Sequence, residues 1–321
     1  MKNNFDDRPR LGVSACLLGD KMRYDGGHKY NTFLCETLGR FVEWIPVCPE
    51  IEVGMGVPPE TVRLVGAASD PRMVAERSGK DWTVAMKRFA AIRTNQLLEL
   101  RLSGYVFKKN SPSCGIERVR VYDRKNVPVP RGGGLFAAAV IRSLPLLPVE
   151  EEGRLNDLAL RESFIERVFA YHRWQKALAG EKFAAALVDF HTRHKFLLLA
   201  HSEPHYRRLG RLVADLKKHS LDSTYEAYGH DFMAGLSVRA TTKKHANVLE
   251  HLMGSFFSDR LGVGERRELV HSIGDFRARL VPLVVPLTMV HHYVKKYDVA
   301  YLAHQVYLAP SPKELVPRSQ V

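Results

Sequence analysis

The chain has 321 residues, 45% of them hydrophobic, which predicts two domains with ordinary buried cores. No apolar run reaches the roughly 18 residues of a membrane span, and residues 1–10 lack a signal core, so we expect a cytoplasmic protein without a membrane partner. The formal net charge of +13 favours a polyanionic partner over a neutral one, with a generally basic, soluble surface as the alternative.

The first half of the chain alternates short apolar runs with helical segments. The expected order is strand 11–16, helix 31–39, strand 41–48, helix 81–102, a strand ending at 107, strand 119–121 and helix 132–141. Strands that alternate with helices predict a Rossmann-like α/β domain with a mostly parallel sheet. Ligands of such domains bind at the carboxyl ends of the strands.

A linker is predicted where Pro145 and Pro148 precede the acidic run 150–153. It divides the chain into an α/β domain over residues 1–150 and a second domain over residues 151–321. The second part has helical periodicity and few strand signals, so we expect an all-α domain. Its clearest helices are predicted at 161–178, 181–200, 206–219, 242–257 and 264–280.

Three of the four cysteines, Cys16, Cys48 and Cys114, follow predicted strand ends, which indicates one shared centre. They are far apart in the chain, unlike the closely spaced ligand pairs of zinc ribbons and fingers. Three thiolates from three loops suit an iron–sulfur cubane in which one iron lacks a protein ligand. Ordinary buried thiols are the alternative, and this is our interpretation of Cys35, on a predicted helix.

The segment from Lys108 to Gly115 forms a loop of lysines, serines and a cysteine, and Gly115 allows a close backbone approach. The lysines are expected to favour the thiolate of Cys114. Ser111 and Ser113 can hydrogen-bond a substrate or a cluster sulfur, or cap the loop backbone. Glu50, close behind Cys48, is a candidate general acid or base.

Other motifs have weaker functional interpretations. Asp25, in Arg23-Tyr24-Asp25-Gly26-Gly27-His28, can bind a substrate N–H or a basic side chain, or belong to a simple turn. The glycine run 132–134 lacks the lysine and hydroxyl of a Walker motif and predicts a close backbone approach near the site. The histidine pairs 191/194 and 201/205 are interpreted as helix-surface residues.

Basic residues of the second half occur in bursts with tyrosines between them. The bursts are 207–211, 217–219, 243–245, 266–267 and 295–296, and the tyrosines are Tyr225, Tyr228, Tyr293 and Tyr297. The combination suits a structured RNA, with cations on phosphates and rings available to unpaired bases. Solvated helix faces explain the same charges without a ligand.

Residues 11 to about 148 resemble the thiouracil desulfurase family. The matching motifs are Ser14-Ala15-Cys16-Leu17-Leu18-Gly19, Arg23-Tyr24-Asp25-Gly26, Cys48-Pro49-Glu50 and Lys108 to Gly115. Residues from about 160 onward resemble a second domain of unknown function, through Tyr228-Gly229-His230-Asp231-Phe232-Met233 and Pro312-Lys313-Glu314-Leu315. The fused arrangement is similar to that of tRNA 4-thiouridine desulfidases.

The resemblance implies a 4Fe-4S cluster held by Cys16, Cys48 and Cys114, with one iron not ligated by protein and open to a thiocarbonyl sulfur. It also implies catalytic roles for Glu50 and Ser111. We expect Asp25, Lys108 and Ser113 to bind the substrate.

The expected reaction is non-redox conversion of 4-thiouridine in tRNA to uridine, with release of sulfide, and the partner is thiolated tRNA. Two alternatives stay open. One is the same chemistry on free thiouracil or a thionucleotide, and the other is a non-catalytic RNA-binding protein with a structural metal. The sequence leaves the oligomeric state undecided.

Overall fold

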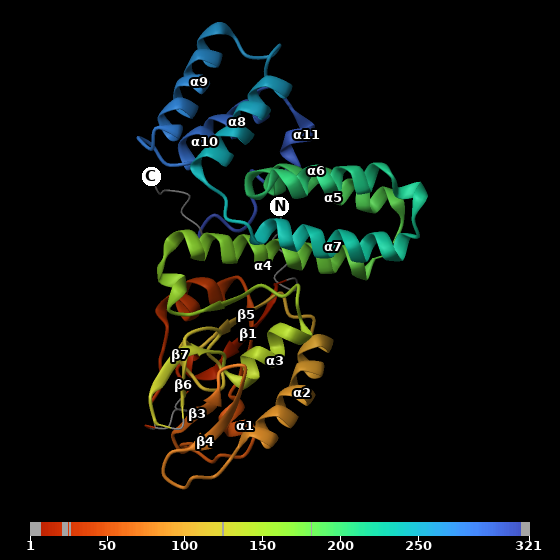
Figure 1. The fold of residues 1–321 in the computed structure, drawn as a ribbon. Coiled ribbons are helices and arrows are strands. Elements are labelled where there is room, and N and C mark those ends of the chain that lie inside the picture. The colour runs from red at the N-terminus through yellow and green to blue at the C-terminus, as the bar shows by residue number, and fades with distance from the viewer. Residues whose placement is uncertain (1–7, 21–24, 26, 124, 181, 316–321) are drawn as a thin grey trace. The chain divides into compact units, whose positions relative to one another are not determined.

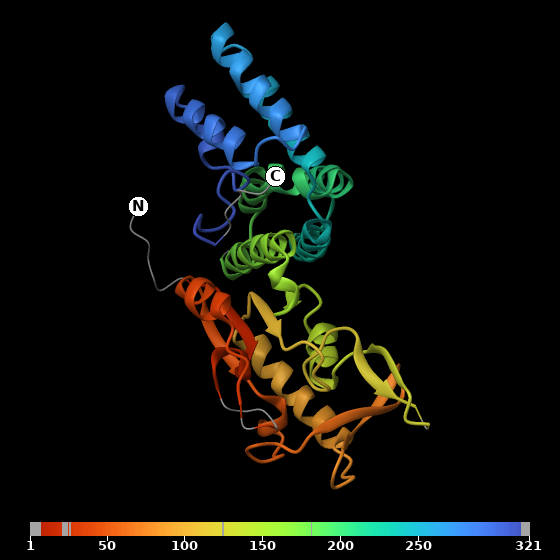
Figure 2. The ribbon, with the colours of Figure 1, turned by 90° about the vertical axis from the view of Figure 1, so that its left-hand side faces the viewer.

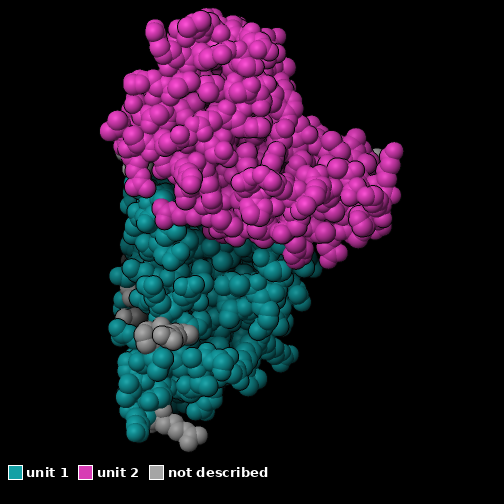
Figure 3. Space-filling view, turned by 45° about the horizontal axis from the view of Figure 1, so that its top comes forward, with its two compact units in different colours: residues 1–164 teal, residues 165–321 magenta. Residues whose placement is uncertain are grey.

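The structure is a computed structural model that describes residues 8–20, 25, 27–123, 125–180 and 182–315. The chain forms two compact units, residues 1–164 and residues 165–321 (Figure 3). The boundary falls inside helix α4 (Leu158–Ala179), beyond the predicted division after residue 150.

The first unit contains a parallel sheet with the strand order β2-β1-β5-β8 (Figure 1). Its strands are β1 (Arg10–Ser14), β2 (Glu43–Val47), β5 (Gly104–Phe107) and β8 (Val149–Glu151). All three pairings are parallel, and every residue of β5 is buried, as expected for a central strand covered on both faces. The predicted α/β class with a mostly parallel sheet is therefore confirmed.

Helices α2 (Thr83–Glu99) and α3 (Leu135–Ser143) belong to the same unit as this sheet (Figure 2). Aromatic side chains join the two helices to the sheet. The ring of Phe136 on α3 contacts Phe89 of α2 and meets Tyr105 of β5 edge-on. The predicted helix 81–102 is confirmed by α2. Its buried face includes Met86, Ala90 and Leu97, whereas Val84 and Leu98 are 81% and 59% exposed.

A second sheet was not expected from the sequence beyond its strand at 119–121. Its order is β4-β3-β6-β7, formed by β3 (Val62–Ala67), β4 (Asp70–Ala75), β6 (Val119–Tyr122) and β7 (Pro128–Gly132). Two antiparallel hairpins, β3–β4 and β6–β7, join through parallel pairing of β3 with β6. This sheet and the residues beside it contribute to the wall of the site described below, through residues 60–63, Arg118, Val119, Arg120 and Tyr122.

The predicted acidic linker is wrong. Val149–Glu151 is the strand β8, and the three glutamates that follow Val149 are at most 8% exposed. The segment pairs with β5 in spite of its loop-like composition. Its three carboxylates can be buried because each accepts hydrogen bonds from backbone N–H groups or from a cation.

The second unit is helical, which confirms the predicted all-α region. Besides α4 it contains α5 (Ala184–His201), α6 (Glu203–Ala214), α7 (Leu221–Ser237), α8 (Thr242–Phe256), α9 (Val263–Arg277), α10 (Val284–Lys296) and α11 (Ala300–Ala303). No helix within the described residues has both the length and the apolar character needed to cross a membrane.

Aromatic and histidine side chains of this unit lie in its core. Trp174 stacks on Tyr225 and contacts Tyr228, and Tyr293 is also buried, so these tyrosines do not present rings to unpaired bases as expected. The interpretation of His194 and His201 as surface residues is wrong too. His201 is 1% exposed and its Nε2 lies 3.1 Å from the carboxylate of Glu166, because both face the helix interfaces.

Candidate active site

The three strand-end cysteines line one cavity of about 740 Å³ in the first unit. Cys16 lies in the turn Ala15–Leu18 directly after β1. Cys48 follows β2 and precedes the short helix α1 (Pro49–Glu52), and Cys114 lies in the loop after β5. Parallel strands deliver all three to the same edge of the sheet, and all three are free thiols.

Burial controls the protonation of these thiols. Desolvation raises the pKa of Cys16 and of Cys48 to about 11, and it raises the pKa of the fully buried Cys114 further. The lysines were expected to favour the thiolate of Cys114, but burial raises the pKa of that thiol. Lys108 instead lowers the pKa of Cys16, and by less than burial raises it. Binding of a metal must therefore displace protons from the site.

The donor set fits a cluster better than a single ion. Within the described ranges no group of three His, Cys, Asp or Glu side chains is arranged to hold one metal ion. A cubane takes one cysteine per iron, so its ligands stand farther apart than the ligands of one ion. Three sulfur donors, in a wall whose described residues include no histidine, are a soft ligand set of the kind that holds iron–sulfur clusters.

A chain of hydroxyls connects the Cys114 loop to Glu50. The Oγ of Ser113 donates to the Oε1 of Glu50 at 2.7 Å, and Ser111 Oγ lies 2.9 Å from Ser113 Oγ. Ser111 Oγ also accepts the backbone N–H of Cys114 at 3.1 Å. With Ser113 donating to Glu50, Ser111 donates to Ser113, so this chain fixes both the carboxylate and the cysteine.

Lys108 and Asp25 have different surroundings. Lys108 lines the cavity, and its backbone N–H donates to Ser14 Oγ at 3.0 Å. Asp25 is exposed, does not line the cavity, and accepts the backbone N–H of Gly27 at 3.0 Å, as in the turn that the sequence also allowed. Its motif neighbours Arg23, Tyr24 and Gly26 lie outside the described residues.

Cys35 is also absent from the cavity wall, with its thiol 3.7 Å from the carbonyl oxygen of Leu17.

Two glycines allow the close packing of the cysteine loop, as the sequence predicted. A Cβ at Gly115 would lie 2.4 Å from the side chain of Val119. A Cβ at Gly134 would lie 2.5 Å from the carbonyl of Ser113 and 2.8 Å from the backbone nitrogen of Cys114. The second contact involves only backbone atoms, which have little freedom to move.

Replacing Gly134 by alanine is expected to displace the Cys114 loop and to destabilise the protein by about 1–3 kcal/mol. Thermal unfolding and iron bound after reconstitution measure the two effects. Gly254→Ala is the matched control, because a Cβ there has no neighbour within 4 Å. Equal iron binding and equal unfolding midpoints for both variants would contradict the close approach.

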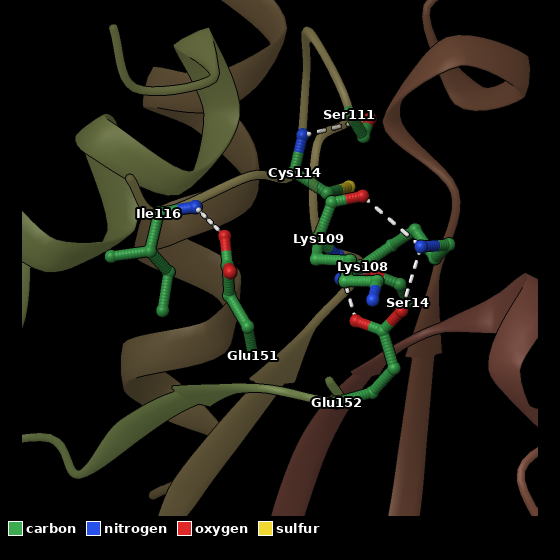
Figure 4. A network of polar contacts seen from close by, with 8 residues as sticks. All are labelled: Ser14, Lys108, Lys109, Ser111, Cys114, Ile116, Glu151 and Glu152. Carbon is green, nitrogen blue, oxygen red and sulfur yellow. Dashed lines mark hydrogen bonds and ion pairs between the residues drawn. The ribbon is translucent and has the colours of Figure 1, made fainter. Parts of the chain in front are cut away.

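Sequence reasoning missed several residues around the site. Glu151 and Glu152 bind the Cys114 loop (Figure 4), although their composition resembled a linker. Arg118 and Arg120, with Tyr122, line the outer cavity from the second sheet. Arg120 lies on the short strand β6 and Arg118 directly before it, so neither belongs to a motif, and only the folded structure shows that they share a cavity with the cysteines.

An α/β protein with three cysteines at the carboxyl edge of a parallel sheet belongs to the class that can bind a metal centre through cysteine sulfur. Comparison with known families shows which family of this class the chain resembles. The model described as 2-thiouracil desulfurase matches residues 11–152, and a model described as a protein of unknown function (DUF1722) matches residues 195–312.

Individual relatives match parts of the chain. The uncharacterized protein YbgA of Escherichia coli is 36% identical over 153 residues, which are 47% of this chain and 90% of that protein. The uncharacterized protein YbbK of Bacillus subtilis is 30% identical over 111 residues, 32% of this chain and 71% of that protein. A solved structure described as the [4Fe-4S]-dependent thiouracil desulfidase TudS shares 30% identity, covering 49% of this chain and 100% of its own, with a TM-score of 0.40.

The chain belongs to the 2-thiouracil desulfurase family through its first unit, which is followed by a DUF1722 region. The resemblance expected from the sequence motifs is therefore confirmed for both parts of the chain. Membership of this family supports a desulfidase, an enzyme that cleaves a carbon–sulfur bond.

Proposed function

We propose that the protein is an iron–sulfur desulfidase that converts 4-thiouridine in tRNA to uridine and releases sulfide. The observation that carries this proposal is the shared cavity, which three cysteines line together with a carboxylate that Ser113 holds and Ser111 supports through Ser113. Cys16, Cys48 and Cys114 would hold a 4Fe-4S cluster. When bound, the cluster supplies a Lewis-acidic iron without a protein ligand, open to the thiocarbonyl sulfur.

The protein's own residues supply the acid–base chemistry. Glu50 lines the same cavity as the three cysteines, and its carboxylate can take a proton from the attacking water there. Ser113 orients the carboxylate through its hydrogen bond to Oε1, and Ser111 orients Ser113. Water replaces sulfur at the ring carbon and sulfide leaves, so the reaction consumes one water and needs no electron donor.

The outer wall of the cavity supports a substrate that carries phosphate. Arg118 and Arg120 are exposed at this wall and have no acidic partner within the described ranges. Glu60 also lines the wall, but its carboxylate accepts the backbone N–H groups of Arg77 and Ser78. A thiolated base that bears a phosphate backbone uses these cations, whereas free thiouracil does not.

Exposed cations of the helical unit support an RNA partner as well. Some members of the basic bursts pair with carboxylates, such as Arg208 with Asp231 and Lys296 with Glu265. Among the described residues of these bursts, five exposed cations form neither an ion pair nor a side-chain hydrogen bond: Arg211, Lys217, Lys243, Arg267 and Lys295. These side chains can bind the phosphates of RNA, and the affinity of such binding depends strongly on salt concentration.

The substrate class is tested by a double replacement of Arg118 and Arg120 with alanine. The variant should lose more turnover on thiolated tRNA than on free thiouracil. The slope of log KM against log salt concentration for tRNA should fall by about 0.7 for each lost phosphate contact on a single strand. Steady-state rates at several salt concentrations measure this. An equal loss on both substrates would support the free base as the substrate.

A further inference from the structure

The acidic run of β8 lies where the chain leaves β5 for the loop that carries Cys114. Parallel pairing places Glu151 opposite Phe107, the last residue of β5. The backbone N–H of Glu152 donates to the carbonyl of Phe107 at 3.1 Å. Strand pairing therefore fixes the position of these glutamates relative to the start of the cysteine loop.

Adjacent glutamates bind the two ends of this loop. At its start, Glu152 accepts the backbone N–H of Lys109 at 2.7 Å and the Nζ of Lys108 at 2.6 Å. At its end, Glu151 accepts the backbone N–H of Ile116 at 2.8 Å. Figure 4 shows the two carboxylates reaching the loop on either side of Cys114.

The alternation of β8 makes this arrangement possible, because successive side chains of a strand point in opposite directions. Both carboxylates are 8% exposed, so water competes little for them. Charge-assisted bonds to backbone N–H groups are short and strong in such surroundings. Removal of either carboxylate would leave part-buried donors of the loop without this acceptor.

We infer that Glu151 and Glu152 are positioning residues, which hold the Cys114 loop in the conformation that ligates the iron–sulfur cluster. The inference rests on the proposed function, because it assumes that Cys114 binds iron. Neither glutamate lines the cavity, so their effect on the reaction passes through Cys114 and Lys108.

Glu150 provides a matched control on the same strand. It is 7% exposed, but its carboxylate binds Arg154 and the backbone N–H of Glu151 instead of the loop. The control variant Glu150→Ala therefore removes a buried carboxylate of β8 and leaves both ends of the loop bound. If replacement of Glu150, Glu151 and Glu152 changes iron release equally, the cause is lower stability of the strand and not a loss of bonds to the loop.

The test measures how fast a ferrous chelator removes iron from the anaerobically reconstituted full chain, with the absorption spectrum of the cluster recorded in parallel. Glu151→Ala should release iron about 10- to 100-fold faster than the unchanged protein, the range known for residues behind metal ligands. Glu151→Gln should restore the unchanged rate, because one oxygen of Glu151 makes its bonds to the loop. Glu150→Ala should release iron at the unchanged rate.

Glu152→Gln tests the other end of the loop without removing side-chain volume. Lys108 and Lys109 bind different oxygens of Glu152, and glutamine replaces one of these oxygens by an NH2 group that cannot accept, so one of the two bonds is lost. Faster iron release with an unchanged unfolding midpoint of the iron-free protein is expected. This variant keeps the inference testable if Glu151→Ala fails to fold.

Two results would overturn the inference. One is equal iron release from Glu150→Ala and Glu151→Ala, and the other is an unchanged rate for Glu152→Gln. Failure of the unchanged protein to bind iron is a separate result, which refutes the proposed cluster itself.

Discussion

Replacing Cys114 by alanine should remove the bound iron and reduce desulfidation to the uncatalysed background. Cys114 is 4% exposed at the centre of the loop, so no water or neighbouring thiol can take its place without moving the backbone. The remaining cysteines offer two ligands, too few to retain a cubane. Iron and sulfide content, together with turnover of a thiolated substrate, measure the loss.

Cys35→Ala is the control for this experiment. The Cys35 thiol does not line the cavity, so its replacement should leave iron content and turnover unchanged. The mechanism would be refuted if Cys114→Ala lost its iron and still turned over substrate. Loss of activity in Cys35→Ala as well would indicate damage to the fold by any cysteine replacement.

Glu50→Gln should retain the cluster and lose turnover by about 10²- to 10⁴-fold, the usual effect of removing a general acid or base. The amide has the same shape and can still accept from Ser113, so the hydroxyl chain is preserved. Only the ability to take up a proton is lost. Single-turnover rates of the iron-loaded variant measure the effect.

Glu43→Gln is the matched control, because Glu43 lies on the strand that leads to Cys48 but forms an exposed pair with Arg10. Its iron content and turnover should equal those of the unchanged protein. A Glu50→Gln variant with turnover within about threefold of normal would exclude Glu50 as the acid or base, since far larger losses are usual.

The sequence predicted the features that depend on local patterns. Cysteines at strand ends and long helices have signals in neighbouring residues, so the α/β and all-α parts and the grouping of Cys16 with Cys48 and Cys114 could be expected. Glu50 and the serines could be found because they directly adjoin the cysteine motifs.

Features that depend on distant pairing could not be predicted. The acidic segment that forms β8 is a strand because it pairs with β5, and nothing in the composition of the segment indicates that pairing. Tyr228 and His201 are polar side chains that the helix interfaces bury, which periodicity does not distinguish from surface positions. The arginines at 118 and 120 joined the site through the second sheet, whose short strands have weak signals.

The central claim is tested most directly by mass spectrometry of nucleosides from tRNA that contains 4-thiouridine, before and after incubation with anaerobically reconstituted protein. We expect 4-thiouridine to disappear, uridine to increase by the same amount, and one sulfide to be released for each base converted. Unchanged 4-thiouridine in the presence of protein with confirmed iron and sulfide would contradict the proposed activity on tRNA.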